Sequence, residues 1–182
     1  DSIVAEGSIT GIAQDRYRNT WISTINQGLV KIDVKLGVTA FDLQEYEGEL
    51  QINSINMLPP DELVLGTGSG ILSIEASELR GRRSLPKKKI IENWEEPINV
   101  LVRAQDSVGL YIGTRENGVW FYPGKKKGGN IKQMKLWETN ERKNIKALIE
   151  AKDKSLWISV EGEGLYKISP GFDSVKLQHT LY

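Results

Sequence analysis

Short runs of apolar residues, bounded by Gly, Asn, Asp or Pro, recur along the whole chain. Several are apolar at most successive positions, as in residues 63–65 and 98–102, instead of alternating with polar residues. Such runs are typical of β-strands that are buried on both faces. No repeat carries an apolar stripe with the 3.6-residue period of an amphipathic helix. The pattern therefore predicts an all-β protein built from short strands.

The runs are arranged in four units that share one order. In each unit a large residue opens the second run, at Trp21, Val64, Tyr111 and Trp157. These positions are 43, 47 and 46 residues apart. A period of about 40–50 residues made of short strands is typical of β-propeller blades. The spacing therefore predicts four blades.

We predict one β-propeller segment over residues 1–182, made of four four-stranded antiparallel blades. The blades are predicted at 9–43, 52–94, 98–137 and 145–182, with 1–8 as the tail of a preceding blade or a linker. The fourth strands are predicted at 38–43, 89–94, 131–137 and 175–180. Because strands of this kind are apolar on both faces, each blade requires neighbouring sheets to cover it.

Three residue types recur in the units, and each has a structural explanation. An aspartate in the first turn can accept hydrogen bonds from nearby backbone amides, and these residues are Asp15, Asp61, Asp106 and Asp153. A glycine before the third strand allows a positive φ or a close approach to the adjacent blade, at Gly28, Gly70, Gly118 and Gly164. The aromatic residue that opens the second strand is expected to fill the gap between blades.

The repeats resemble the two-component regulator propeller repeats. The resemblance rests on Thr20–Thr24 with Gly28, on Leu110–Thr114 with Gly118, and on 156–160 with 164–165, and it covers about residues 9–182. The second repeat departs most from the pattern, because Val64 replaces the aromatic residue.

This resemblance implies the periplasmic sensor region of a hybrid two-component histidine kinase, which recognises an oligosaccharide and signals through dimer rearrangement. The kinase domain would lie elsewhere in the parent protein. Since that family usually has seven blades, the four repeats are expected to be a fragment of a larger, seven-bladed propeller. Self-association, or contact with the remaining blades of the parent, is expected to cover the outer faces. Membrane contact is expected only through a domain absent here.

Composition excludes several function classes. The chain has 24 Lys and Arg against 24 Asp and Glu, which is unlike a general nucleic-acid binder. It has no Cys and a single His, His179, so a Cys or Ser nucleophile has no plausible base and a zinc site has no ligands. We expect no catalytic residue, metal or cofactor, and no enzymatic activity in this segment. The carboxylate pairs at 95–96 and at 161 and 163 are read as solvated loop charges.

A ligand is expected at the loops between the second and third strands and between successive blades, which share one face of a propeller. The candidate residues are Asn26, Gln27, Trp94, Arg115, Asn117, Trp137, Arg142 and Glu161. Trp94 and Trp137 could serve as platforms for a sugar, but packing between blades is the preferred explanation of both. The basic stretches 80–89 and 125–135 are read as solvated loops, with attraction of an acidic polysaccharide or a membrane surface as the alternative.

Three functions remain open from the sequence. The first is the oligosaccharide-sensing module, the second is a protein-interaction scaffold without a small ligand, and the third is a propeller enzyme acting on polysaccharide.

Overall fold

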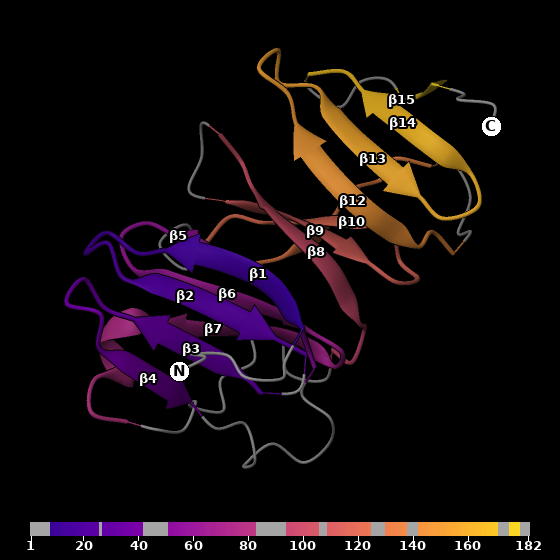
Figure 1. The fold of residues 1–182 in the computed structure, drawn as a ribbon. Coiled ribbons are helices and arrows are strands. Elements are labelled where there is room, and N and C mark those ends of the chain that lie inside the picture. Colours follow the sequence, from indigo (N-terminus) through magenta and orange to yellow (C-terminus); the bar gives the residue numbers. More distant parts are fainter. Residues whose placement is uncertain are drawn as a thin grey trace. The chain divides into compact units, whose positions relative to one another are not determined.

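The computed structural model describes residues 8–25, 27–41, 51–82, 94–105, 109–124, 130–137, 142–170 and 175–178. The chain divides into two compact units, 1–95 and 96–182. Each unit contains two antiparallel sheets whose strands follow one another in sequence order (Figure 1).

Four sheets account for every strand of the described residues. The first sheet contains β1 (Ile9–Gln14), β2 (Thr20–Thr24), β3 (Leu29–Ile32) and β4 (Val38–Phe41). The second contains β5 (Ile52–Leu58), β6 (Glu62–Thr67) and β7 (Gly70–Glu75). The third contains β8 (Ile98–Arg103), β9 (Leu110–Thr114), β10 (Val119–Tyr122) and β11 (Lys132–Gln133). The fourth contains β12 (Ile145–Glu150), β13 (Leu156–Val160), β14 (Gly164–Ile168) and β15 (Val175–Gln178). The prediction of four antiparallel blades is confirmed.

The outer strands differ from the prediction in detail. In the third sheet the fourth strand is β11, which has only two residues, where a strand over 131–137 was predicted. In the second sheet the fourth strand was predicted at 89–94. Residues 89–93 lie outside the described residues, and Trp94 is not in a strand. Residues 42–43 and 179–180 also lie outside them. A single 3-10 turn, η1 (Ala76–Leu79), follows β7 where no helix was expected, and the burial of Leu79 anchors it.

All four sheets share an irregularity that the sequence does not reveal. The register of the first strand against the second shifts once in every sheet, between Ile9 and Gly11 and at the equivalent positions of β5, β8 and β12. A bulge places two residues opposite one, so the side chains on either side of it can face the same neighbour. The shared register shows that the four sheets are equivalent repeats.

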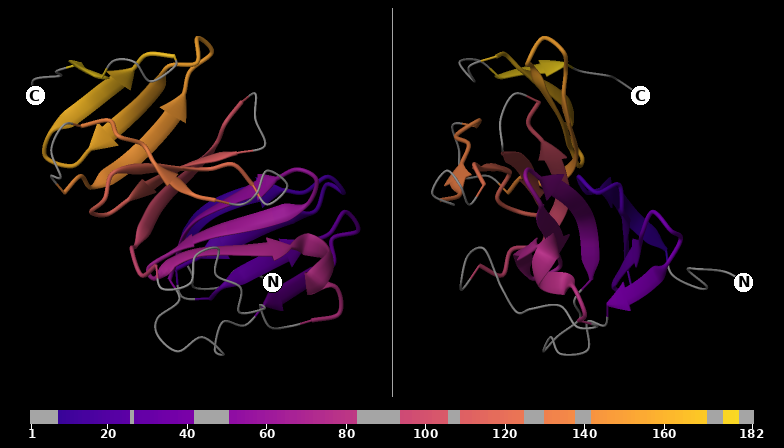
Figure 2. Two further views of the ribbon diagram at one scale, coloured as in Figure 1. Left: turned by 180° about the vertical axis from the view of Figure 1, so that it is seen from behind. Right: turned by 90° about the vertical axis from the view of Figure 1, so that its left-hand side faces the viewer.

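Within the first unit, the two sheets pack face to face, with β5 against β1 and β2 (Figure 2). Trp21 is 1 % exposed and stacks on Phe41, with 5.8 Å between ring centroids. Gly11 lets the backbones approach, because a Cβ there would lie 2.7 Å from Cγ2 of Ile55. The predicted role of the first aromatic residue is confirmed.

The second unit repeats this packing with different side chains. Strand β12 lies against β8 and β9, and Tyr111 is buried in their shared core. A Cβ at Gly113 would lie 2.6 Å from Cγ2 of Ile145. The amide of Asn99 donates to the Asn144 side chain at 2.8 Å and to the Ile145 carbonyl at 2.9 Å, which ties the sheets together.

The faces of the first and fourth sheets that have no partner within their own units are apolar and exposed. Ile12 is 63 % exposed, whereas Ile55, its equivalent in the second sheet, faces the first sheet and is 6 % exposed. On the fourth sheet Ile149 is 63 % exposed, and Trp157 is half-buried where Trp21 is covered. These residues have the chemistry of a surface that another sheet covers.

The contrast between the two tryptophans gives a stability prediction. Trp21→Ala removes a fully buried side chain and should lower the free energy of unfolding by about 3–5 kcal/mol. Trp157→Ala removes a half-buried side chain and should lower the free energy of unfolding clearly less. Urea denaturation followed by circular dichroism measures both, and equal losses would contradict the packing described here.

Candidate functional site

The hairpins between the second and third strands are closed by one repeated interaction. The Thr24 amide and hydroxyl both donate to the Gly28 carbonyl at 3.0 Å. In the same way, the Thr114 amide and hydroxyl donate to the Gly118 carbonyl at 3.0 and 2.9 Å. In the second sheet the Thr67 hydroxyl donates to Gly70 at 2.9 Å. These glycines have φ angles of +77°, +70° and +124°, which confirms the predicted need for glycine. The recurring threonine was the available signal for this closure, and its role was missed.

The candidate residues assigned to the first unit are Asn26, Gln27 and Trp94. Gln27 is exposed, and its amide donates to the Thr24 hydroxyl at 3.0 Å. Trp94 is half-buried, and its carbonyl oxygen lies 2.6 Å from where a Cβ on Gly70 would be. Asn26 lies outside the described residues.

In the second unit, Glu96 holds the hairpin that carries Arg115 and Asn117. Its Oε1 accepts from the amides of Glu116 at 2.7 Å and Asn117 at 3.0 Å, and its Oε2 accepts from the Asn117 side chain. The Arg115 amide donates to the Pro97 carbonyl at 3.0 Å. Glu96, which was expected to be a solvated loop charge, therefore shapes this hairpin.

The connection before the fourth sheet is joined to the same hairpin through backbone atoms. The Lys143 amide donates to the Glu116 carbonyl at 2.9 Å, and the Gly118 amide donates to the Lys143 carbonyl at 3.2 Å. Arg142 reaches the Glu116 carboxylate with Nη1 at 3.5 Å. The fold thus brings the predicted Arg115, Asn117 and Arg142 onto adjacent segments.

Next to Arg142 in the sequence, Lys143 forms a partly buried ion pair with Glu163 that the sequence did not reveal. The Lys143 ammonium donates to Oε1 and Oε2 of Glu163 at 2.6 and 2.8 Å, and the Tyr166 hydroxyl donates to Oε2 at 2.6 Å. Burial alone would raise the pKa of Glu163, but these hydrogen bonds and the Lys143 charge outweigh burial and lower it. Nothing in the sequence distinguishes Lys143 from the other cations of a chain with 24 Lys and Arg.

Glu161, the last predicted contact, stands in the β13–β14 hairpin and is exposed. It accepts from the Asn144 side chain, and Lys146 Nζ lies 2.9 Å from its Oε1. The Lys146 hydrogen bond holds the pKa of Glu161 below its usual value.

Trp137 serves packing between sheets. Its ring meets Tyr166 edge-on at 86°, with 5.8 Å between centroids, and a Cβ on Gly118 would lie 3.2 Å from the indole. Its Nε1 is buried and has no hydrogen-bond partner among the described residues. This arrangement matches the packing alternative named for Trp137 above.

Four of the candidate side chains are therefore exposed on adjoining segments of the second unit. We call Arg115, Asn117, Arg142 and Glu161 the loop surface. It presents two guanidinium groups, an amide and a carboxylate, which together can donate to and accept from a neutral polar ligand. In the described part of the chain, no three His, Cys, Asp or Glu side chains gather as metal ligands would.

The turns between first and second strands confirm the aspartate prediction in part. Asp15 Oδ1 accepts from the amides of Tyr17 and Asn19, both at 2.9 Å, and Oδ2 accepts from Trp21 Nε1 at 3.0 Å. Burial would raise the pKa of Asp15, but bonds from the Asn19 and Trp21 side chains and from the backbone lower it.

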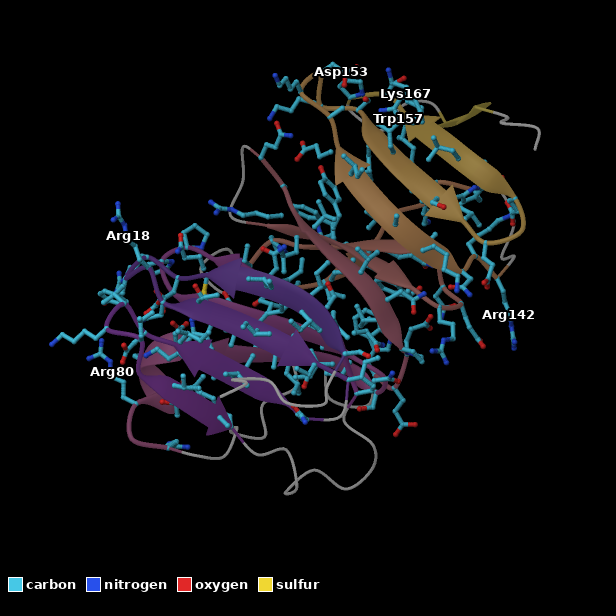
Figure 3. The ribbon with its side chains drawn as sticks, in the orientation of Figure 1. Arg18, Arg80, Arg142, Asp153, Trp157 and Lys167 are labelled. Atoms are coloured by element: carbon cyan, nitrogen blue, oxygen red, sulfur yellow. The ribbon has the colours of Figure 1, made fainter. Side chains whose placement is uncertain are left out.

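Asp153 forms the same kind of turn and accepts from the Ser155 amide at 3.0 Å. Bonds from the Ser155 hydroxyl and amide, and then from Lys167, lower its pKa to about 2. Figure 3 shows Asp153, Trp157 and Lys167 together at one end of the fourth sheet, where Lys167 Nζ lies 5.3 Å from the Trp157 ring centroid.

The prediction is wrong for Asp61, whose side chain accepts no backbone amide among the described residues. The turn before β6 has only three residues, so Asp61 directly precedes the strand and takes the position of Asn19 in the first sheet. Asp106 lies outside the described residues.

The basic stretches are described only in part. Arg80, Arg82, Lys132 and Lys135 are exposed. Residues 83–89 and 125–129 lie outside the described residues.

No protein-family model matches the chain, and no curated protein matches it. Among solved structures, it is similar to the extracellular domain assigned to a hybrid two-component system of B. thetaiotaomicron, with a TM-score of 0.70 and 18 % identity over 98 % of this chain and 23 % of that one. A second extracellular domain assigned to such a system in the same organism has a TM-score of 0.55 and 16 % identity, over 94 % of this chain and 28 % of that one. A streptogramin B lyase has a TM-score of 0.67 and 15 % identity, over 97 % of this chain and 57 % of that one.

The chain is a β-propeller segment. It spans about a quarter of the length of the two extracellular domains, at 23 % and 28 %. Within the described residues, no helix of this propeller segment is long and apolar enough to cross a membrane.

The Lys143–Glu163 pair gives a prediction with a pH signature. Glu163→Gln leaves the buried Lys143 ammonium without its charged partner, and because Glu163 itself is 31 % exposed, it should lower the free energy of unfolding by about 1–3 kcal/mol at pH 7. The folded-state pKa of Glu163 is lowered. Its contribution to the free energy of unfolding is therefore present above the unfolded-state pKa and is lost as pH falls through the folded-state pKa.

Denaturation at a series of pH values measures this effect. The difference between wild type and Glu163→Gln should shrink as the solution is acidified below the usual glutamate range. Glu161→Gln is the matched control, since its ion pair with Lys146 is exposed and its loss should be much smaller. Equal losses in the two variants would show that the Lys143–Glu163 pair does not stabilise the loops.

Proposed function

We propose that this segment is the ligand-sensing propeller module of a hybrid two-component sensor, on the extracellular or periplasmic side of the membrane. The repeat pattern supports the proposal, as does the similarity to two extracellular domains assigned to such systems. The segment would contribute part of the ring in the parent protein, with both of its units in that one propeller. Its activity would be binding and not catalysis.

The observation that carries the proposal is the construction of the loop surface. Lys143 and Glu163 form a partly buried pair in the adjoining segments, and main-chain hydrogen bonds fix the backbone that presents Arg115 and Asn117. A rigid frame lowers the entropy cost of binding, because the contact residues are already positioned. Exposed guanidinium, amide and carboxylate groups suit the hydroxyls of an oligosaccharide, with Asn26, Gln27 and Trp94 as further proposed contacts on the loops of the first unit.

Signal transfer is proposed to use the exposed apolar faces. Ile9 and Ile12 on the first sheet, and Ile149 on the fourth, require cover by the remaining blades of the parent or by a second copy. A change in that contact when ligand binds would rearrange a dimer. The protein-interaction scaffold differs only in lacking the small ligand, so the same binding experiment separates the two functions.

Ligand binding is tested by thermal shift with neutral and acidic oligosaccharides. A ligand present at 100 times its Kd should stabilise the folded state by about 2.7 kcal/mol and raise Tm. The double variant Arg115→Ala/Arg142→Ala should lose most of this rise, because it removes both exposed guanidinium groups. Lys135→Ala is the control, since Lys135 is an exposed cation outside the loop surface.

Three outcomes would count against the sensing module. No rise in Tm with any oligosaccharide would favour the scaffold. Release of shortened product from the same panel would favour an enzyme. An equal loss in the Lys135→Ala variant would mean that the effect is only general charge attraction.

The exposed faces generate a prediction about association. The isolated segment should increase in mass with concentration in sedimentation equilibrium, and Ile12→Glu should weaken this by placing a charge in the contact. Leu36→Glu is the matched control, because Leu36 is 80 % exposed in a turn of the same sheet and not on its face. A wild-type monomer at all concentrations would contradict the proposed role of these faces.

A further inference from the structure

A cavity of about 220 Å³ lies in the first unit, between the β1–β2 turn and the segment that follows β7. Its wall includes Asp15, Tyr17, Lys31, Asp61 and Arg80. It is at the end of the strands where β1 turns into β2, which is the end opposite to the β2–β3 hairpin. It is therefore separate from the β2–β3 hairpin, which carries Gln27.

Asp61 is the unusual residue of this wall. It is 4 % exposed, and its Oδ1 has no hydrogen-bond partner among the described residues. The nearest cation is Arg16, whose Nε lies 4.0 Å from Oδ2 and thus beyond hydrogen-bond distance. Burial, with the neighbouring Asp15 charge, raises the pKa of Asp61 despite the Arg16 and Arg80 charges. Buried carboxylates ordinarily have donors, so this one lacks the partner that its position calls for.

Asp15, the other carboxylate of the wall, is already satisfied. Both of its oxygens accept hydrogen bonds, from the backbone and side-chain nitrogens of Asn19 in its own turn and from Trp21 Nε1 of β2. It therefore shapes the cavity but has little capacity left for an occupant. Asp61 is the carboxylate that an occupant would reach.

The charges around the cavity select the chemistry of that occupant. Arg16, Lys31 and Arg80 disfavour a cation, and the two carboxylates disfavour an anion. Figure 3 shows Arg80 at the end of the first unit, and its guanidinium carbon lies 5.9 Å from the ring centroid of Tyr17. The wall thus combines an acceptor, donors and an aromatic ring, a combination that suits a neutral molecule with several hydroxyl groups.

The size of the cavity limits the occupant to a small unit. Pockets for drug-sized ligands are typically about 300–1,000 Å³, and this one is smaller. Lys31 and Arg80 also line a second cavity of about 560 Å³ that runs along β4, which leaves room for a longer molecule to continue.

We propose that the Asp61 cavity binds one neutral hydroxyl-rich unit, a single sugar ring or a cyclitol, with a hydroxyl donating to Asp61 and an oxygen accepting from Arg80. The site is independent of the loop surface and stands whether or not the loop surface binds an oligosaccharide.

Binding is tested with D-glucose and myo-inositol as probes, by saturation-transfer NMR and calorimetry on the whole segment. Asp61→Asn keeps the shape of the side chain but removes the charged acceptor, and it should weaken binding at least about tenfold. Arg80→Gln should also weaken it. Arg18→Gln is the matched control, because Arg18 extends from the same end of the unit (Figure 3) and does not line the cavity.

A stability measurement separates a binding role from a structural one. The folded-state pKa of Asp61 is raised, so its contribution is favourable at low pH and is lost as pH rises through the folded-state value. At pH 7 Asp61→Asn should therefore raise Tm while it weakens binding, as expected where a site is held at the expense of stability. A lower Tm in this variant would show that the fold uses the carboxylate, and would overturn the proposal.

Each other result also decides the question. Binding of either probe that is lost in Asp61→Asn and kept in Arg18→Gln and in Arg115→Ala/Arg142→Ala supports the site. Absence of saturable binding means that the cavity holds only water, and saturable binding of methylguanidinium in place of the polyols means that it takes a cation; both overturn the proposal. Binding that is lost only in Arg115→Ala/Arg142→Ala overturns this site and leaves the loop surface as the place of recognition.

Discussion

The structure depends on the burial of a sheet by the next sheet. A blade of four short strands has two apolar faces and cannot hide both by itself, so its stability comes from contact with an equivalent neighbour. Within the two units the contact is made by Trp21 and by Tyr111, and by glycines that let the backbones approach. Trp21 shows the effect most directly, since the same position on the fourth sheet, Trp157, is only half-covered where its unit supplies no further sheet.

Much of the fold could be predicted because its signals are local and repeated. The spacing of Trp21, Tyr111 and Trp157 indicated blades, and the glycines before each third strand marked turns with positive φ. The outer strands were harder to predict, because an edge strand is less constrained by neighbours and its sequence is less apolar. The short β11 and the 3-10 turn after β7 both occur in these outer parts. The common bulge left no trace in the sequence because it depends on pairing and not on residue type.

The candidate site was predictable as a set of loops and not as a set of contacts. The fold brings Arg115, Asn117 and Arg142 together, but the residues that hold them, Glu96 and the Lys143–Glu163 pair, looked like ordinary surface charges. Distances between segments decide such pairs, and a single sequence does not contain those distances. Asp61 shows the reverse error, because a repeated residue type suggested a turn role that its three-residue turn does not allow.

The main-chain bridge between Asn117 and Lys143 has a consequence for how such a surface can diversify. Amide and carbonyl groups are present whatever the side chain, so this junction survives substitution of the residues it joins. The side chains above it are then free to change their charge or size without loosening the scaffold. A surface built in this way can change its chemical character through a few exposed substitutions, while the backbone that presents it remains intact.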